Sequence, residues 1–187
     1  MNIKEILSLM NEELSACFAS LNEGQLDELK GAIRGADRVF VAGAGRSLMM
    51  IRPLAMRLMH MGLTAYVVGE TVTPAIGKGD LLVIASGSGA TGTMEAIARK
   101  CKKIGAKLAL ITIRADSPIG HLADVIVEVK AGTSKDVPGA APSVQPGANS
   151  FEQCVLMIGD AIVIDLFQGM SVEENNKILM SRHANLE

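Results

Sequence analysis

The segment from Leu82 to Thr91 places the strongest constraint on what this chain can fold into. An apolar run is followed by Ser86-Gly-Ser-Gly-Ala-Thr91 and then by a helical pattern over residues 92–104. A strand–turn–helix junction of this kind directs backbone N–H groups and hydroxyls at one point, where the helix dipole favours an anion. The turn has no lysine and so lacks the Walker pattern of nucleotide-binding loops. It therefore predicts a cradle for a phosphate monoester, such as that of a sugar phosphate.

Size and composition predict one globular domain. The chain has 187 residues, of which 49% are hydrophobic and 20% charged, a balance far from that of disordered proteins. The net charge is −2, the basic residues are scattered, and only 3% of residues are aromatic. We therefore expect a small-molecule ligand, with no nucleic acid and no membrane as partner.

Cysteine usage and hydropathy predict a soluble cytoplasmic protein. Cys17, Cys101 and Cys154 are dispersed and form no CxxC pair, which favours reduced thiols and argues against a metal or redox cofactor. The amino terminus lacks the apolar core of a signal peptide. The longest apolar segment, 155–167, contains two aspartates and is too short to span a bilayer.

Hydrophobic periodicity predicts an α/β protein. Helical spacing of apolar residues occurs at 3–19, 23–34, 47–61, 92–104, from 149 or 150 to about 168, and from 172 onward. Short runs of Val, Ile and Leu predict strands at 38–42, 64–68, 81–85, 107–113 and 125–129. Because these runs are almost continuously apolar, the strands should be buried on both faces. We expect a three-layer α/β/α sandwich with a five-stranded parallel sheet and extra helices at both termini.

The predicted elements form a single domain over residues 1–187. Its parts are amino-terminal helices (1–35), an α/β core (36–130), a loop (131–148), and carboxyl-terminal helices with a tail (149–187). The loop is rich in Gly, Pro, Ala and Ser and is long for a connection, which indicates a functional or mobile segment. Asn149 or Ser150 is expected to cap the helix that follows.

A second glycine turn, Gly43-Ala-Gly-Arg-Ser47, follows the first predicted strand. It could form part of the same ligand pocket, with Ser47 opening a helix, or it could be a plain tight turn. A dinucleotide site requires Gly-x-Gly-x-x-Gly, but Leu48 occupies the third glycine position. Glu70 could imitate the ribose-binding acid, so nucleotide binding is the weaker alternative.

Three hydroxyls, Ser86, Ser88 and Thr91, lie within six residues at a helix start. Capping the helix needs only one of them, Ser88 or Thr91. Taken together with the turn that contains Ser47, the surplus of hydroxyls favours phosphate binding.

Glu152 is the candidate general base. At helical spacing it shares a face with Val155, Leu156 and Gly159, a stripe that should be buried, and a carboxylate there is costly without a purpose. An acid in the first helical turn is also common as a complement to the dipole, and the two interpretations weigh about evenly. Asp160 and Asp165, in the same helix, are assigned to polar faces or an interface.

The histidines and methionines give weaker signals. His60, at a predicted helix end, is typical of dipole complementation, and His121 is expected to be structural. His183, in the polar tail, could reach a neighbouring subunit or be solvated. Five of the eleven methionines lie in 49–61 and fit a helix packed in a core or an oligomer interface.

The chain resembles the sugar isomerase (SIS) domain family and, within it, the 6-phospho-3-hexuloisomerases, over nearly its full length. The glycine turns are typical of SIS domains in general, whereas segment 67–74 and the closing hexapeptide 182–187 are typical of the 6-phospho-3-hexuloisomerases in particular. The segments that support the resemblance are Gly43-Ala-Gly-Arg-Ser47, Ala55-Met-Arg-Leu-Met-His60, Val67-Val-Gly-Glu-Thr-Val-Thr-Pro74, Ser86-Gly-Ser-Gly89, Asp116-Ser-Pro-Ile-Gly120, Phe151-Glu-Gln153 and Arg182-His-Ala-Asn-Leu-Glu187.

The resemblance implies a flavodoxin-like fold and a homotetramer with active sites near subunit contacts. It implies interconversion of D-arabino-hex-3-ulose 6-phosphate and D-fructose 6-phosphate without a cofactor, a step of formaldehyde fixation by the ribulose monophosphate route. Glu152 would then be the proton-transferring base, with His60 at the catalytic site. The phosphate would be held by Ser47 and by the turn formed by Ser86, Gly87, Ser88, Gly89, Ala90 and Thr91.

Two other functions remain open beside nucleotide binding. One is an SIS isomerase of another sugar phosphate. The other is a non-catalytic sugar-phosphate sensor; such regulators usually have an amino-terminal DNA-binding domain, for which the leading 35 residues are too short and insufficiently basic.

Overall fold

A single parallel sheet organises the protein. The computed structural model describes residues 1–132 and 143–186, and its five strands have the order β2-β1-β3-β4-β5. Every neighbouring pair is parallel, which confirms the predicted sheet. The strands are β1 (Val39–Gly43), β2 (Ala65–Val67), β3 (Leu81–Ala85), β4 (Lys107–Thr112) and β5 (Val125–Glu128).

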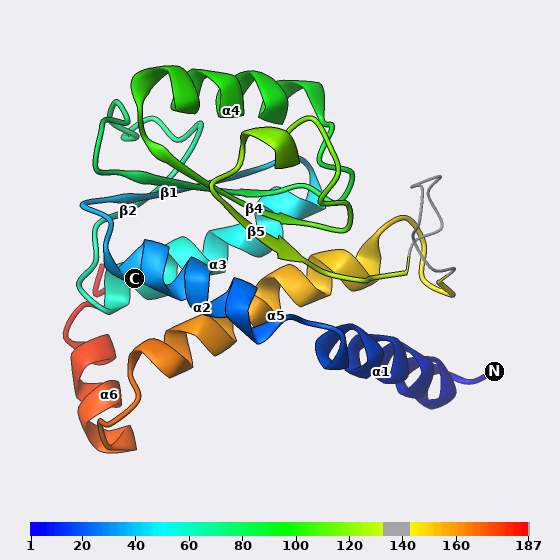
Figure 1. Ribbon diagram of the computed structural model, residues 1–187. Coiled ribbons are helices and arrows are strands. Elements are labelled where there is room, and N and C mark those ends of the chain that lie inside the picture. Colours follow the sequence, from blue (N-terminus) through cyan, green and yellow to red (C-terminus); the bar gives the residue numbers. More distant parts are fainter. Residues whose placement is uncertain (133–142, 187) are drawn as a thin grey trace.

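Helices cover both faces of the sheet, as expected for a three-layer sandwich (Figure 1). On one face lie α4 (Gly92–Ile104) and the short 3-10 helix η1 (Gly120–Leu122). The other face carries α2 (Glu23–Arg34), α3 (Arg46–His60) and α5 (Asn149–Leu166). Two helices extend beyond these layers, α1 (Ile3–Ala19) and α6 (Val172–Met180). The observed element bounds differ from the predicted ones by at most about two residues.

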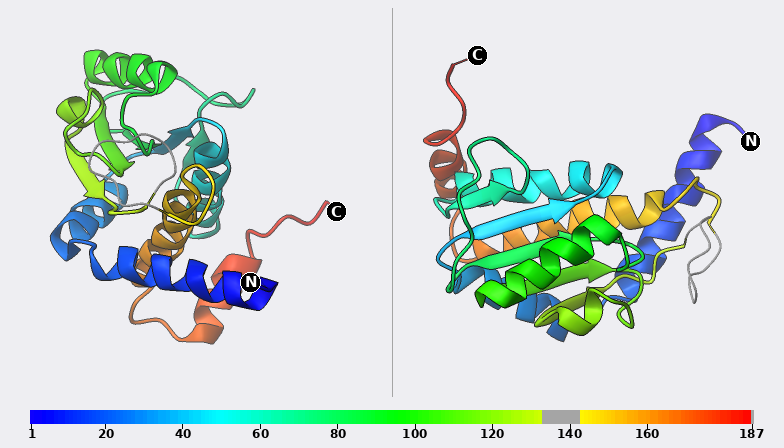
Figure 2. Two further views of the ribbon diagram at one scale, coloured as in Figure 1. Left: turned by 90° about the vertical axis from the view of Figure 1, so that its right-hand side faces the viewer. Right: turned by 90° about the horizontal axis from the view of Figure 1, so that it is seen from above.

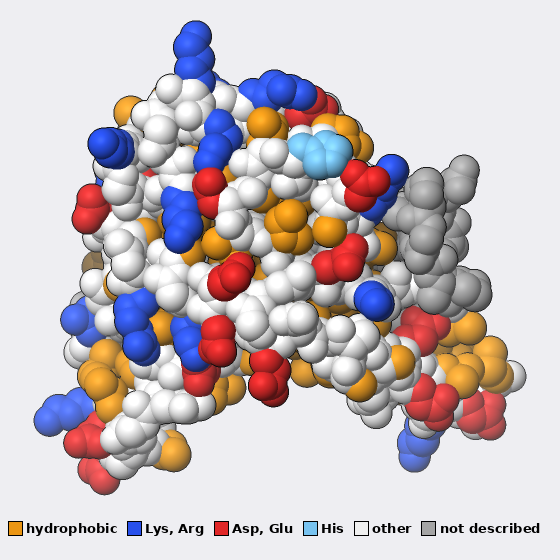
Figure 3. All heavy atoms as spheres, in the orientation of Figure 1, with side chains coloured by type: hydrophobic (Ala, Val, Ile, Leu, Met, Phe, Trp, Pro, Cys, Tyr) orange, Lys and Arg blue, Asp and Glu red, His pale blue; other side chains and the backbone are white. Residues whose placement is uncertain are grey.

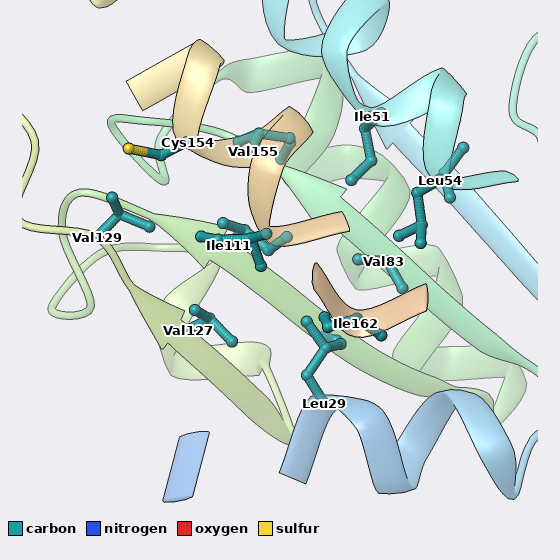
Figure 4. Close-up of a cluster of buried hydrophobic side chains, with 14 of the residues drawn as sticks. Leu29, Ile51, Leu54, Val83, Ile111, Val127, Val129, Cys154, Val155 and Ile162 are labelled. Carbon is teal, nitrogen blue, oxygen red and sulfur yellow. The ribbon is translucent and has the colours of Figure 1, made fainter. Parts of the chain in front are cut away.

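Two hydrophobic cores, one on each face, hold the layers together. All residues of β1 and β3 are buried, because both of their faces are covered. Side chains of the larger core come from α2, α3, α5 and the central strands and point toward one another (Figure 4). The smaller core, under α4, includes Phe40, Leu82 and Leu110.

The chain order of the sheet creates a crevice at one edge. After β1 the chain continues into α3 on one face, and after the adjacent β3 it continues into α4 on the opposite face. In open parallel sheets this reversal leaves a gap beyond the carboxyl ends of the two strands, where ligands bind. Both glycine turns singled out in the sequence, 43–47 and 86–91, lie at this reversal.

Close backbone packing explains the first glycine turn. A Cβ on Gly43 would lie 2.8 Å from the backbone nitrogen of Leu48, so α3 can start here only if residue 43 has no side chain. Gly45 has φ +56°, a conformation that residues other than glycine rarely adopt. The steric requirement thus falls on Gly43, and Leu48 is accommodated.

The start of α5 differs from the sequence prediction. Neither Asn149 nor Ser150 caps this helix: Ala148 is at the N-cap position, and no side chain there accepts from the helix N–H groups. Asn149 is instead the first helical residue, and the Ser150 hydroxyl donates to the carbonyl of Gly132 at 2.9 Å. A contact with a distant segment thus replaces a local cap. Part of the predicted loop 131–148, residues 133–142, lies outside the described residues.

The two outer helices, α1 and α6, lie at opposite ends of the strands. Figure 2 shows α1 near the edge where the strands end and α6 with the tail near the edge where they begin. Ile3 and Leu7 of α1 are 76% and 56% exposed.

On the face drawn in Figure 3, acidic and basic side chains intermingle. Within the described part of the chain, no helix has the length and apolar character needed to cross a membrane.

A buried ion pair fixes the entrance to β3. The Asp80 carboxylate, 2% exposed, accepts from Nε of Arg38 at 3.0 Å and from the Gly77 N–H at 2.7 Å. Burial alone would raise the pKa of Asp80, but the hydrogen bonds from Arg38 and Gly77 outweigh it and lower this pKa.

We expect Asp80→Asn to lower the free energy of unfolding by about 2 kcal/mol, because Arg38 loses its anionic partner. Because the Asp80 pKa is depressed in the folded state, this contribution is present above about pH 4 and lost as the pH falls further. Urea denaturation of the wild type and the variant at pH 7 and at pH 3 would measure the loss in free energy of unfolding and its dependence on pH. The control, Asp116→Asn at an exposed pair with His121, should change little; equal losses for both variants would contradict the assignment.

Candidate active site

A pocket of about 430 Å³ lies beyond the carboxyl ends of β1 and β3. It brings together both glycine turns and the first turn of α5, which are far apart in the sequence. Its lining consists of Ala44, Gly45, Arg46, Ser47, Ala85, Ser86, Gly87, Ser88, Thr91, Ile113, Ala148, Phe151 and Glu152.

Three helices begin at this pocket, and none of them has a side-chain cap. The N-cap positions of α3, α4 and α5 are occupied by Gly45, Thr91 and Ala148, and no side chain at these positions accepts from the N–H groups of its helix. By contrast, the three other α-helices of the described chain are capped, by Asn2, Asn22 and Ser171. The first N–H groups of an uncapped helix lack intrahelical acceptors, and the dipole adds positive potential. The pocket is therefore built to receive an anion.

Hydroxyls supplement these N–H groups. The Oγ of Ser86 and the Oγ1 of Thr91 lie 3.2 Å apart across the turn, and the Ser88 hydroxyl accepts from the N–H of Ala90 at 3.3 Å. Ser47, in the first turn of α3, also lines the pocket. Of Ser88 and Thr91, the two residues expected to cap α4, Thr91 is at the N-cap position. Its hydroxyl nevertheless contacts the hydroxyl of Ser86 and not the N–H groups of the helix. It thus remains available to a ligand.

Glu152 is buried in the wall of the pocket, as the helical spacing predicted. It is 6% exposed and pairs with the guanidinium of Arg46, whose Nε donates to its Oε2. α3 and α5 start at the same edge and pack closely, with Gly159 against Leu54. This packing places a carboxylate and a cation from distant parts of the chain side by side.

Arg46 is the site residue that the sequence analysis missed. A cation in the first helical turn is unfavourable for the helix dipole, and α3 has no acidic residue there to offset it. An arginine at such a position requires an anionic partner elsewhere, and this signal could have identified it. The structure supplies that partner in Glu152.

The structure brings together most, but not all, of the predicted site residues. Ser47, Ser86, Gly87, Ser88, Thr91 and Glu152 line one pocket. Gly89 and Ala90 lie outside its lining. The N–H of Gly89 is bonded to the Ser86 carbonyl at 3.1 Å and that of Ala90 to the Ser88 hydroxyl, so these two residues shape the turn.

His60 and His183 lie together, away from Glu152. The fifteen residues of α3 run from the pocket to the opposite edge of the sheet, a length of about 20 Å. There the buried His60 ring stacks on that of His183 with 5.5 Å between centroids, which brings the tail onto the end of α3. Burial, together with the charges of Arg57 and His183, lowers the pKa of His60. Within one chain, neither histidine reaches the pocket.

Other candidate residues have separate surroundings. Asp165 pairs with Lys30 at 2.6 Å, and His121 bonds to Asp116 at 2.9 Å. Met49, Met56 and Met59 are partly exposed and line a shallow groove beside β2. The described residues contain no group of three or more His, Cys, Asp or Glu side chains able to hold a metal ion.

Comparison with known proteins identifies the family. The model of the SIS domain matches residues 32–150, which include the sheet, both glycine turns and the approach to α5. The chain belongs to the SIS domain family.

Within that family, the chain is similar to proteins named 3-hexulose-6-phosphate isomerase. The 3-hexulose-6-phosphate isomerase of Mycobacterium gastri is 42% identical, covering 100% of this chain and 92% of its own. The enzyme of the same name from Bacillus subtilis is 35% identical over the whole of both chains. Among solved structures, a hypothetical protein of Methanococcus jannaschii, inferred to be a 3-hexulose-6-phosphate isomerase, is 30% identical, with a TM-score of 0.82 over 98% of this chain and 99% of its own.

The buried ion pair generates a double-mutant prediction. Arg46→Met should lower the free energy of unfolding by about 2 kcal/mol, because it leaves the Glu152 carboxylate buried without a countercharge. Adding Glu152→Gln should recover most of that loss, since no charge then remains unpaired. Urea denaturation of the two single variants and the double variant measures the coupling, and strictly additive effects would refute it.

Proposed function

We propose that this protein interconverts D-arabino-hex-3-ulose 6-phosphate and D-fructose 6-phosphate by proton transfer through an enediol. The observation that supports this most directly is the position of Glu152: a buried carboxylate in the same pocket as three uncapped helix termini. The relatives named 3-hexulose-6-phosphate isomerase favour this sugar over other phosphates. Such an enzyme would act in formaldehyde fixation by the ribulose monophosphate route in the cytoplasm.

The reaction needs one acid–base group and a fixed sugar. A carbonyl moves from C3 to C2 when a proton leaves C2, an enediol forms, and a proton is returned to C3, while a hydroxyl proton shifts from O2 to O3. The Glu152 carboxylate takes the carbon proton and gives it back, so it is unchanged after each turnover. The reaction is internally balanced and consumes no second substrate.

The remaining pocket residues orient the sugar and balance charge. In the proposed complex the phosphate lies against Ser47 and the turn containing Ser86, Ser88 and Thr91. Binding energy from this non-reacting group holds the sugar carbons against Glu152. The Arg46 guanidinium offsets the charge of the carboxylate and lies close enough to stabilise negative charge on the enediolate oxygens.

The positions of His60 and His183 suggest an active site shared between subunits. His60 and His183 lie about one helix length from Glu152 in the same chain. We propose a homotetramer in which His60, with His183 beside it, completes the pocket of a neighbouring subunit. The exposed apolar side chains of α1 and the methionine groove beside β2 offer surface for such contacts.

Replacement of the base gives the direct test. Glu152→Gln should lower isomerase turnover by several orders of magnitude, because an amide cannot accept the carbon proton. Protection by fructose 6-phosphate against thermal unfolding should persist, since the phosphate contacts are intact. Turnover is followed as fructose 6-phosphate formed from the hexulose phosphate, with a panel of other sugar phosphates tested in parallel.

A matched control lies in the same helix. Asp160 is an exposed carboxylate of α5, and Asp160→Asn should retain wild-type turnover. Near-normal turnover of the Glu152 variant would eliminate the proposed base. Faster conversion of another sugar phosphate by the wild-type protein would favour the alternative isomerase.

Subunit mixing tests whether the site is shared. His60→Gln and Glu152→Gln should each be inactive as pure oligomers. After equimolar mixing and reassociation, about a quarter of sites should combine an intact His60 with an intact Glu152 from different chains. Recovery of about that fraction of activity is expected, whereas no recovery in verified hybrids would refute the shared site.

A further inference from the structure

A carboxylate of α1, outside the pocket, holds the segment that leads into α5. The Oε2 of Glu13 accepts from the Ser143 hydroxyl at 2.7 Å and from the Gln145 amide at 3.0 Å. Its Oε1 accepts from the backbone N–H of Val144 at 2.9 Å. One side chain thus gathers three donors from the segment that leads into α5.

The chemistry of this cluster requires a carboxylate. The three donors come from consecutive residues, 143–145, and an ionised carboxylate is a group that only accepts. Gln145 is 4% exposed, and among the described residues its Oε1 has no hydrogen-bond partner, so its link to α1 is the amide contact with Glu13. Burial would raise the pKa of Glu13, but the hydrogen bonds from Val144, Gln145 and Ser143 outweigh it and lower this pKa.

The cluster matters because α5 has no local cap. A helix whose N-cap side chain accepts its own N–H groups fixes its first turn locally, and α5 has Ala148 in that position. The orientation of its first turn depends instead on distant contacts, namely the bonds of Glu13 to segment 143–145 and the bond from Ser150 to Gly132. Ala148 and Glu152, on either side of Ser150, both line the pocket. A shift of this turn would move the carboxylate relative to a bound sugar.

We propose that Glu13 is a positioning residue for Glu152, acting through segment 143–145 to hold the first turn of α5 in its catalytic orientation. This inference rests on the proposed function for its kinetic consequence. Its structural part, the fixing of α5 by α1, is independent of which sugar phosphate reacts. Glu13 is absent from the pocket lining, so its effect must pass through the protein.

The test compares two adjacent glutamates of α1. Glu13→Gln keeps the shape of the side chain but replaces one accepting oxygen with a donor that faces the donors of 143–145. It should lower kcat about tenfold or more, because a displacement of about an ångström is costly for proton transfer, while KM stays within about twofold. Glu12→Gln, at an exposed position one residue away, should behave as wild type in both constants.

Two further measurements separate positioning from general loss of stability. Amide hydrogen exchange of Glu13→Gln should rise in 144–152 and stay unchanged in β1 and β3. Ser143→Ala should lower kcat in the wild-type background and have no further effect in Glu13→Gln, because the two groups share one contact. A fall in kcat that merely follows the unfolded fraction, additive effects of the two substitutions, or exchange that rises equally throughout the sheet would overturn the proposal.

Failure of the proposed function is distinguishable from failure of this inference. If the wild-type protein does not convert the hexulose phosphate, the proposed function fails, while hydrogen exchange still shows whether Glu13 holds α5. If the wild type is active and Glu13→Gln retains its kcat, the inference alone fails.

Discussion

The convergence of three helix amino termini at one edge of the sheet is the constraint on which the rest of the structure depends. A parallel sheet sends each connection back from the carboxyl end of a strand, and the reversal between β1 and β3 opens a crevice there. α3, α4 and α5 begin at this crevice without side-chain caps, whereas the α-helices of the described chain that begin elsewhere have them. Free N–H groups are tolerated because an anionic ligand can satisfy them.

The same crevice makes a buried carboxylate tolerable. Glu152 lies where burial would otherwise disfavour its charge, and Arg46, from the start of another helix, supplies the countercharge. An arginine in a first helical turn and a carboxylate on an apolar stripe are each unfavourable alone. Together they place an acid–base group beside a cation, an arrangement suited to moving a proton on a phosphorylated sugar.

Much of the fold was predictable because local patterns agree with the tertiary structure. The strands are short apolar runs buried on both faces, and α1, α2 and α4 begin and end where spacing and turn residues indicated. The pocket hydroxyls and Glu152 were identified because they break an otherwise plain pattern. Arg46 was missed because its role depends on a carboxylate 106 residues away. The cap of α5 was misassigned because a distant contact replaces the local one.

The layers of the fold, the two glycine turns and the candidate base could be inferred from residue types and spacings, because each lies within one segment of the chain. Which of these residues meet depends on packing and on helix length, since these set the distance between groups that are far apart in the chain. Packing of α3 against α5 joins Glu152 to Arg46, and Glu13 of α1 binds the segment that leads into α5. The length of α3 places His60, stacked on His183, at the far ends of the strands from the pocket.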